Sequence, residues 1–297
     1  MSTTLPAAAI NAVATAIAAA DGVRAASVEA VALGRGSVGT HWRFAVGGRR
    51  YFVKAAALVD AAAFAAEADG LQALAGCAAL VVPRVVAQGV ADDDTAFLAL
   101  DWLALDAQGD DAVLGDALVQ LHALRFDAHG WRRDNFIGAT PQHNARCADW
   151  PTFFLQRRLA PMLARAAAHG APTLAEQAAF LFDGVPPGLQ HTPAPALLHG
   201  DLWRGNVGFV GGRAALFDPA AHAGDAECDL AMAALFGGFS PRFFAAYAAR
   251  VPPLPGAAWR RALYQLYHVL NHYVLFGGGY AAQATALLAR LRQRDVG

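Results

Sequence analysis

Eight consecutive residues in the C-terminal half of the chain have types and spacing that suit phosphoryl transfer. The segment from His199 to Asn206 reads HGDLWRGN, which has the H-x-D-x-x-x-x-N pattern of a kinase catalytic loop. In such a loop the aspartate orients the attacking hydroxyl and accepts its proton, and the asparagine holds a magnesium ion. Asp201 is therefore the candidate catalytic base and Asn206 a candidate metal ligand. A buried His-Asp pair that only caps a loop is the alternative, and His199 is expected to brace the loop.

A second metal ligand follows at a suitable place. The apolar segment 207–217 contains the tight-turn pair Gly211-Gly212 and ends in Phe217-Asp218-Pro219. A short hairpin would therefore return the chain to the loop and present the Asp218 carboxylate. Magnesium prefers hard oxygen ligands from one or two carboxylates together with substrate phosphates. The loop, the turn and this aspartate are together more specific than the loop alone.

The only lysine of the chain is also placed for this chemistry. Lysine and arginine together number 23, and every one except Lys54 is arginine. A compact ammonium contacts phosphates where a planar guanidinium fits poorly. Lys54 follows a glycine-rich segment, and Glu67 comes later in a helix-forming stretch. This is the kinase order of phosphate-covering loop, strand lysine and helix glutamate. The candidate residues of the loop are Gly34, Gly36, Ser37 and Gly39. An ordinary glycine-rich hairpin and a lysine retained by chance are the alternatives.

The elements that must position these residues differ between the two parts of the chain. Alternating apolar residues predict strands at 28–33, 42–46, 50–54, 85–90 and 97–103, and a helix is expected over 60–75. The alanine-rich segment 7–20 is interpreted as an amphipathic first helix, with a disordered tail as the alternative. Helical patterns dominate after the acidic stretch 106–111, at 112–124, 152–168, 174–182, 227–236, 241–249, 257–275 and 280–292.

These patterns predict an α+β fold with two lobes. The N-terminal lobe, residues 1–103, would be an antiparallel sheet with one inserted helix that binds nucleotide. The C-terminal lobe, residues 104–297, would be mainly helical and carry the catalytic loop. At the end of the last strand, Asp101 and Leu103 are expected to offer backbone groups to adenine. An ordinary core strand is the alternative there.

Composition excludes several classes of protein. The 297 residues are 56% hydrophobic with a net charge of −1, which favours a sizeable core and argues against a nucleic-acid surface or a polybasic membrane patch. No apolar run reaches the roughly 18–20 residues of a membrane span. The 3 cysteines are scattered, which argues against a disulfide framework and favours a reducing, cytoplasmic setting.

Several longer strings resemble the fructosamine and ketosamine kinase family. They cover the chain from about Gly34 to Tyr280 and include LLHGDLW at 197–203, NFIG at 135–138, DW at 149–150, FDP at 217–219, DLAM at 229–232, LFGGF at 235–239 and LYQLYH at 263–268. The resemblance implies a protein-kinase-like fold, ATP and Mg²⁺ as cofactors, and phosphorylation of the 3-hydroxyl of a free or protein-bound ketosamine. It implies that Lys54 and Glu67 form an ion pair on the ATP side and that Asp229 braces the catalytic loop. Ribulosamine or erythrulosamine is expected rather than fructosamine.

The chain departs from the family pattern at two places. No cysteine stands in the glycine-rich segment, which puts redox switching through that loop in doubt, and Ala226 rather than an arginine precedes Glu227. A monomer is expected.

The substrate side is open to more than one interpretation. Trp203 could stack on a sugar, or it could pack the loop onto a helix. His268 and His272 are four residues apart on one predicted helix. They are expected to form a polar wall of the cleft; core hydrogen bonding and a zinc pair are the alternatives.

Two other functions fit parts of the pattern. A kinase for an aminoglycoside, choline or another small alcohol would share the phosphoryl-transfer residues. A pseudokinase scaffold would be expected to lack one of Lys54, Asp201, Asn206 or Asp218, and all four are present.

Overall fold

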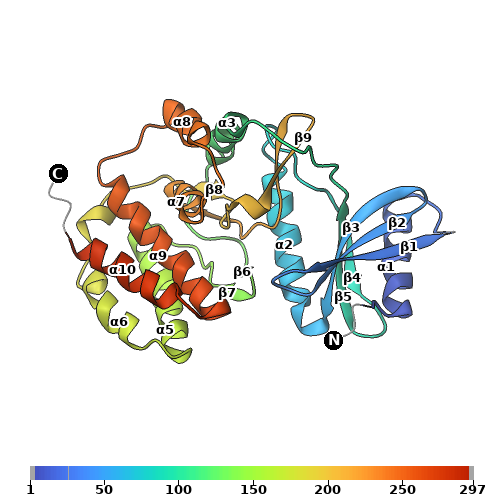
Figure 1. Ribbon diagram of the computed structural model, residues 1–297, viewed down its shortest axis with the longest axis horizontal. Helices are drawn as coiled ribbons and strands as arrows, with labels where there is room; N and C mark the ends of the chain where they lie inside the picture. The colour runs from blue at the N-terminus through green and yellow to red at the C-terminus, as the bar shows by residue number, and fades with distance from the viewer. Residues whose placement is uncertain (1–3, 26, 294–297) are drawn as a thin grey trace.

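The computed structural model describes residues 4–25 and 27–293, which form a sheet lobe and a mainly helical lobe (Figure 1). The sheet lobe contains one five-stranded sheet in the order β1-β2-β3-β5-β4, and all neighbouring strands are antiparallel. Its strands are β1 (Val28–Arg35), β2 (Thr40–Val46), β3 (Arg49–Ala57), β4 (Val85–Val90) and β5 (Thr95–Asp101). The expected α+β, kinase-like arrangement is confirmed.

Two helices cover the opposite faces of this sheet. The alternation of side chains along β5 shows this, because Phe97 and Ala99 pack in one cluster with α1 (Ala7–Asp21), whereas Leu98 and Leu100 pack with α2 (Ala61–Leu74). The helix expected near the N-terminus is therefore present and belongs to the sheet lobe. The helix α2 lies between the sheet and the helical lobe (Figure 1).

The helical lobe begins after the β5 strand and a connection through residues 102–110. The lobe boundary expected after Leu103 falls within this connection and stays a prediction. The helices are α3 (Asp111–His122), α4 (Trp150–Phe154), α5 (Ala160–Ala168), α6 (Thr173–Ala178), α7 (Glu227–Leu235), α8 (Pro241–Arg250), α9 (Ala257–Phe276) and α10 (Tyr280–Arg292). Nearly the whole middle of α9 is buried, so this helix forms the centre of the larger core.

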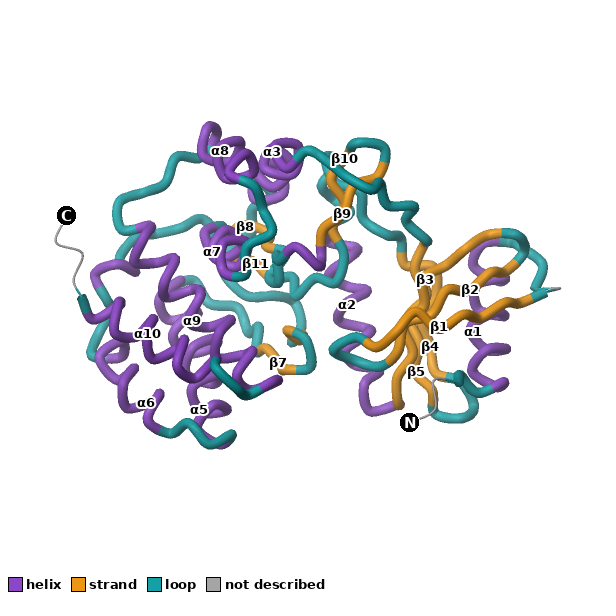
Figure 2. The backbone as a smooth tube through the Cα atoms, in the orientation of Figure 1, coloured by secondary structure: helices purple, strands orange, loops and turns teal. Residues whose placement is uncertain are grey.

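Three short strand pairs interrupt the helices (Figure 2). They are β6 (Asn135–Ile137) with β7 (Thr140–Gln142), β8 (Ala196–Leu198) with β11 (His222–Gly224), and β9 (Val207–Val210) with β10 (Arg213–Leu216). The hairpin predicted around Gly211-Gly212 is confirmed by the β9–β10 pair. Sequence reasoning did not find the β6–β7 hairpin or the partner of β8.

Two predicted helices differ in detail. The segment expected to be one helix over 152–168 contains a wider π-helical turn, Leu155–Leu159, between α4 and α5. The segment expected to be helical over 174–182 continues after α6 only as a 3₁₀ turn, Ala179–Phe182. Neither difference moves a candidate site residue.

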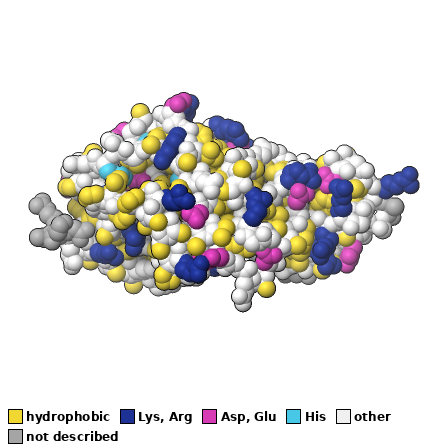
Figure 3. All heavy atoms as spheres, turned by 90° about the horizontal axis from the view of Figure 1, so that it is seen from above, with side chains coloured by type: hydrophobic (Ala, Val, Ile, Leu, Met, Phe, Trp, Pro, Cys, Tyr) yellow, Lys and Arg dark blue, Asp and Glu magenta, His cyan; other side chains and the backbone are white. Residues whose placement is uncertain are grey.

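The surface carries charges of both signs. On the face shown in Figure 3, basic and acidic side chains are interspersed and do not gather into one patch. No helix in the part of the chain that the structure describes is long and apolar enough to cross a membrane.

Candidate active site

The catalytic-loop segment is held in place by backbone and side-chain hydrogen bonds. Asp229, on the first turn of α7, accepts the backbone N–H groups of His199 (2.7 Å) and Gly200 (2.9 Å), and it also contacts the buried His122 (3.1 Å). The ring of His199 lies 3.0 Å from the carbonyl of Phe217. Asp229 and His199 thus brace the loop, as expected, and neither lines the cleft described below.

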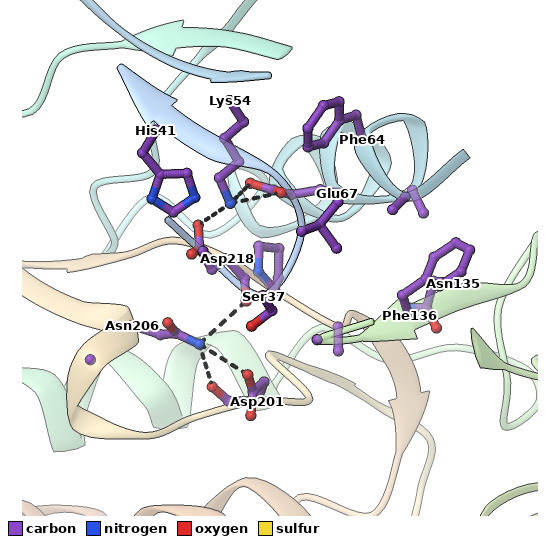
Figure 4. Close-up of a pocket in the computed structure, with 18 of the residues that line it drawn as sticks. Ser37, His41, Lys54, Phe64, Glu67, Asn135, Phe136, Asp201, Asn206 and Asp218 are labelled. Carbon is purple, nitrogen blue, oxygen red and sulfur yellow. Dashed lines mark hydrogen bonds and ion pairs between the residues drawn. The ribbon is translucent and has the colours of Figure 1, made fainter. Parts of the chain in front are cut away.

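Asp201 and Asn206 lie side by side on this loop (Figure 4). The Asn206 amide Nδ2 donates to the Asp201 carbonyl (2.9 Å) and carboxylate (3.2 Å), and more weakly to the Asp218 carbonyl (3.4 Å). Burial raises the pKa of Asp201 to about 7, although the Asn206 hydrogen bond acts in the opposite direction. A carboxylate with a pKa near neutrality is well matched to accept a proton at physiological pH.

Lys54 connects the two lobes through charge. The residue is only 5% exposed, and its ammonium lies 2.8 Å from Glu67 of α2 and 2.7 Å from Asp218 of the helical lobe (Figure 4). Burial lowers the pKa of Lys54, but the two carboxylates outweigh it and hold the pKa above its usual value. Burial also raises the pKa of Glu67 to about 7, and the negative charge of Asp218 acts in the same direction, whereas the Lys54 ammonium opposes the shift. Lys54 keeps the pKa of Asp218 low despite burial.

The oxygens that could hold a divalent metal face the same space. Because Asn206 uses its Nδ2 for Asp201 and Asp218, its Oδ1 is the atom left to bind a cation. Asp218 binds Lys54 through one carboxylate oxygen, which leaves the second free. Its backbone φ of +57° lies in the left-handed region, where strain is often found at functional sites. Two oxygen ligands plus phosphates fit a magnesium ion. No cluster of three or more His, Cys, Asp or Glu side chains suited to a metal occurs within residues 4–25 and 27–293.

The glycine-rich loop closes over this centre from the sheet lobe. A Cβ on Gly39 would lie 2.2 Å from the carbonyl oxygen of Ala55, and its φ is +67°. A Cβ on Gly36 would lie 2.4 Å from the ring of His41. Gly36 and Ser37 line the cleft, whereas Gly34 and Gly39 shape the loop and do not line the cavity. His41, which sequence reasoning missed, also lines the cleft, and burial together with Lys54 lowers its pKa.

A second cavity of about 360 Å³ adjoins the first at the end of β5. It is lined by Asp101 and Leu103, the two residues expected to offer backbone groups to adenine. His41 and Asp218 line both cavities. Its apolar lining suits a flat heteroaromatic ring. The main cleft, about 440 Å³, brings together Lys54, Glu67, Asp201, Trp203, Asn206 and Asp218.

The predicted substrate residues separate into two groups. Trp203 is 42% exposed and lines the main cleft, so its indole is available to a ligand. His268 and His272 do not line it. His268 is 4% exposed and borders a small internal cavity, and His272 packs against Phe236 (4.6 Å between ring centroids) and Phe276 (5.6 Å). The expectation that both histidines form a polar cleft wall is contradicted by this placement, because His268 is buried inside the helical lobe and His272 packs against aromatic rings.

Aromatic and amide side chains occupy that wall instead. Asn135 and Phe136 of β6 and Phe276 at the end of α9 line the cleft. Asn135 is fixed by its donation to the carbonyl of Ala221 (2.8 Å) and by the amide of Asn144 (2.8 Å). The NFIG string at 135–138 was the available signal for two of these residues, but it carried no assigned role.

Comparison with known proteins agrees with this geometry. The family model described as fructosamine kinase matches residues 9–294. The chain belongs to the fructosamine kinase family. A relative from Synechocystis named "Probable ketoamine kinase" is 40% identical over 250 residues, covering 82% of this chain and 83% of the relative. A relative of the same description from Vibrio parahaemolyticus is 38% identical, covering 89% and 92%.

Solved structures show the same relationship. A Thermobifida fusca protein described as a "putative fructosamine-3-kinase" has a TM-score of 0.84 at 32% identity, covering 95% of this chain and 99% of the other. Aminoglycoside phosphotransferase APH(4)-Ia has a TM-score of 0.62 at 18% identity, covering 96% and 100%, and therefore shows the shared fold alone. This member of the fructosamine kinase family is a kinase that transfers phosphate to a hydroxyl group.

Proposed function

We propose that this protein uses ATP and Mg²⁺ to phosphorylate the 3-hydroxyl of a ketosamine. The observation that carries the proposal is the convergence of Asp201, Asn206, Asp218 and Lys54 on one cleft in a member of the fructosamine kinase family. The same fold in APH(4)-Ia has been solved with AMP-PNP, an ATP analogue, which supports a nucleotide in this cleft.

Each residue has a role that its position supports. Adenine would enter the cavity at Asp101 and Leu103, with the phosphates beneath the glycine-rich loop at Gly36 and Ser37. Lys54, held by Glu67, would contact the phosphates. Asn206 and Asp218 would hold a magnesium ion, which neutralises charge that develops on the phosphates. Asp201 would orient the acceptor hydroxyl and take its proton as the phosphorus–oxygen bond forms.

The charges of the cleft favour a monoamine over a polycation. The acidic side chains among the described residues that line the main cleft are Glu67, Asp201 and Asp218. Each of these carboxylates is already assigned to the phosphoryl-transfer machinery. An aminoglycoside carries several ammonium groups and would need further carboxylates for them. A ketosamine carries a single amine beside its sugar, so the cleft suits it better.

The instability of a ketosamine 3-phosphate indicates what the reaction would achieve. A ketosamine 3-phosphate eliminates inorganic phosphate and hydrolyses to a free amine and a dicarbonyl sugar, so phosphorylation would reverse glycation of an amine. The 3 cysteines are unpaired in the structure, and we propose a reducing, cytoplasmic setting. We also propose that the protein is a monomer. Ribulosamine and erythrulosamine are the sugars we expect to be preferred.

The test is turnover with a substrate panel. Purified protein, MgATP and ribulosamine, erythrulosamine, fructosamine, choline or kanamycin are followed by ADP release, and ³¹P NMR follows the product. We expect ADP release with ketosamines, and a transient sugar phosphate that is replaced by inorganic phosphate. The Asp201→Asn variant controls for contaminating kinases. A stable phosphate ester, or turnover only with choline or kanamycin, contradicts the proposal.

A further inference from the structure

Aromatic rings line the acceptor side of the cleft. Phe276, Phe136 and Trp203 line the same cavity as Asp201. Phe276 is 66% exposed and Trp203 42%, high values for large apolar side chains beside a reaction centre. Apolar side chains exposed inside a concave site gain stability when a ligand removes them from water. These rings are therefore candidates for contact with a part of the acceptor that is not the reacting sugar hydroxyl.

The position of Phe276 is fixed by its own neighbours. It is the last residue of α9, and Gly277 ends the helix with φ +66° while its N–H donates to the carbonyl of Tyr273 (2.8 Å). The ring packs on His272, which in turn packs on Phe236 and Tyr280. The predicted substrate residue His272 thus supports Phe276 from behind, while Phe276 itself borders the cavity.

Three segments meet beside this ring. A Cβ added to Gly138, in the turn of the β6–β7 hairpin, would lie 3.2 Å from the Leu275 side chain and 3.6 Å from Ser37. The hairpin, the end of α9 and the glycine-rich loop therefore converge at one mouth of the cleft. An acceptor with its reacting hydroxyl at Asp201 would lie in a cavity whose wall includes Phe136 and Phe276.

The geometry points to a subsite for the nitrogen substituent of the acceptor. We propose that Phe276, together with Phe136, binds an apolar or aromatic group carried on the ketosamine nitrogen, so this inference rests on the proposed function. The carboxylates that line the cleft are occupied by the reaction chemistry, so this wall offers apolar contact and the faces of rings. Such faces also tolerate the positive charge of the amine. Phe276 is then a specificity-determining residue.

The test compares two ketosamines that share one sugar and differ in the amine. One is made from methylamine and the other from benzylamine, and kcat and KM are measured for both with wild type, Phe276→Ala, Phe276→Tyr and Phe236→Ala. Phe236 is the matched control, because it is 40% exposed and packs on His272 like Phe276 but does not line the cleft. Phe276→Tyr retains the ring and is the conservative variant.

We expect wild type to favour the benzylamine adduct about tenfold or more in kcat/KM, as contact with one apolar group allows. Phe276→Ala should lose most of this preference through a higher KM for the benzylamine adduct, while Phe276→Tyr and Phe236→Ala keep the preference. Equal use of both adducts by wild type, an unchanged preference in Phe276→Ala, or an equal loss in Phe236→Ala overturns the subsite and leaves the proposed function standing. If neither the methylamine adduct nor the benzylamine adduct is phosphorylated, both the subsite and the proposed function are overturned.

Discussion

Replacement of Lys54 by methionine should destabilise the protein in a way that depends on pH. Lys54 is buried between Glu67 and Asp218, and burial already brings the pKa of Glu67 to about 7 with the ammonium present. Without the ammonium, the pKa of Glu67 must rise further, because the carboxylate stays buried and Asp218 remains nearby. Folded Lys54→Met therefore carries a proton on Glu67 above pH 7, whereas the unfolded chain releases that proton near pH 4.3.

The sign and size follow from proton linkage. Above pH 7 the folded variant binds one proton more than the unfolded variant, so its unfolding free energy falls as the pH rises. Wild-type Glu67 is about half protonated in the folded state at pH 7 and mostly ionised in both states by pH 8, so its own slope has largely disappeared above pH 8. The difference in unfolding free energy between wild type and Lys54→Met should therefore grow by up to ~1.4 kcal/mol per pH unit, or about 2–3 kcal/mol between pH 7 and pH 9.

Urea unfolding followed by tryptophan fluorescence at pH 7, 8 and 9 measures this difference. The double variant Lys54→Met/Glu67→Gln is the control, because glutamine cannot titrate and should make the difference from wild type nearly independent of pH between pH 8 and 9. Parallel pH curves for wild type and Lys54→Met would refute the reasoning. A slope that persists in the double variant would refute the assignment to Glu67.

Four further outcomes are expected. Lys54→Arg should lose most of its activity although the charge is kept, because a guanidinium cannot occupy the compact position between Glu67 and Asp218; wild-type kcat and KM for ATP would show that the lysine is incidental. Asp201→Asn should lower kcat by about 10²–10⁴-fold while fluorescent-nucleotide binding is retained; turnover within a few-fold of wild type contradicts a role as base. Asp218→Ala should remove most metal-dependent nucleotide binding, measured by calorimetry with and without Mg²⁺, and full activity in excess chelator contradicts the metal site. Burial lowers the pKa of His222 and of His268 to about 3, so the unfolded chain takes up protons on both below about pH 6.5 before the folded protein does. Each ring should thus lower the unfolding free energy by up to ~1.4 kcal/mol per pH unit between pH 6 and 4, whereas Asp201 and Glu67, whose pKa values are raised, act in the opposite direction. The unfolding free energy of wild type minus that of His268→Asn, measured by urea unfolding at pH 6, 5 and 4, should therefore fall by up to ~1.4 kcal/mol per pH unit as the pH is lowered.

The residues that could be predicted from sequence are those fixed by short spacing or by strand order. Asp201 and Asn206 share one loop, so their separation along the chain constrains their distance in space. Lys54 and Glu67 follow from the succession of loop, strand and helix, which the sheet lobe preserves. The sequence did not determine how α2 packs against the sheet. That packing is the one further contact that the Lys54–Glu67 pair requires.

The hydrophobic periodicity of the sequence does not show whether the missed residues face the cleft or the core. Phe276 ends a helix that is apolar along most of its length, so its exposure could not be distinguished from burial. The same ambiguity led to the interpretation of His268 as cleft-facing, although it is buried. The β8–β11 pair joins segments separated by the whole loop and hairpin, and a three-residue strand has too little pattern to predict a partner.

The helix α2 has a further consequence, because it is attached to both lobes. Glu67 faces Lys54 of the sheet, and Asp69, on the same helix, accepts the indole N–H of Trp131 (2.6 Å) and pairs with Arg132 of the helical lobe. The chain beyond α2 is also tied to the helical lobe, since Val81 exchanges backbone hydrogen bonds with the β10 strand at 2.8 and 3.0 Å. Glu67 is thereby positioned before any nucleotide binds, and the ammonium of Lys54 is fixed with it. Charges that are already oriented need no reorganisation during the reaction, so they stabilise the transition state without an ordering cost at that step. The lysine–glutamate pair is accordingly held by a helix that contacts both lobes.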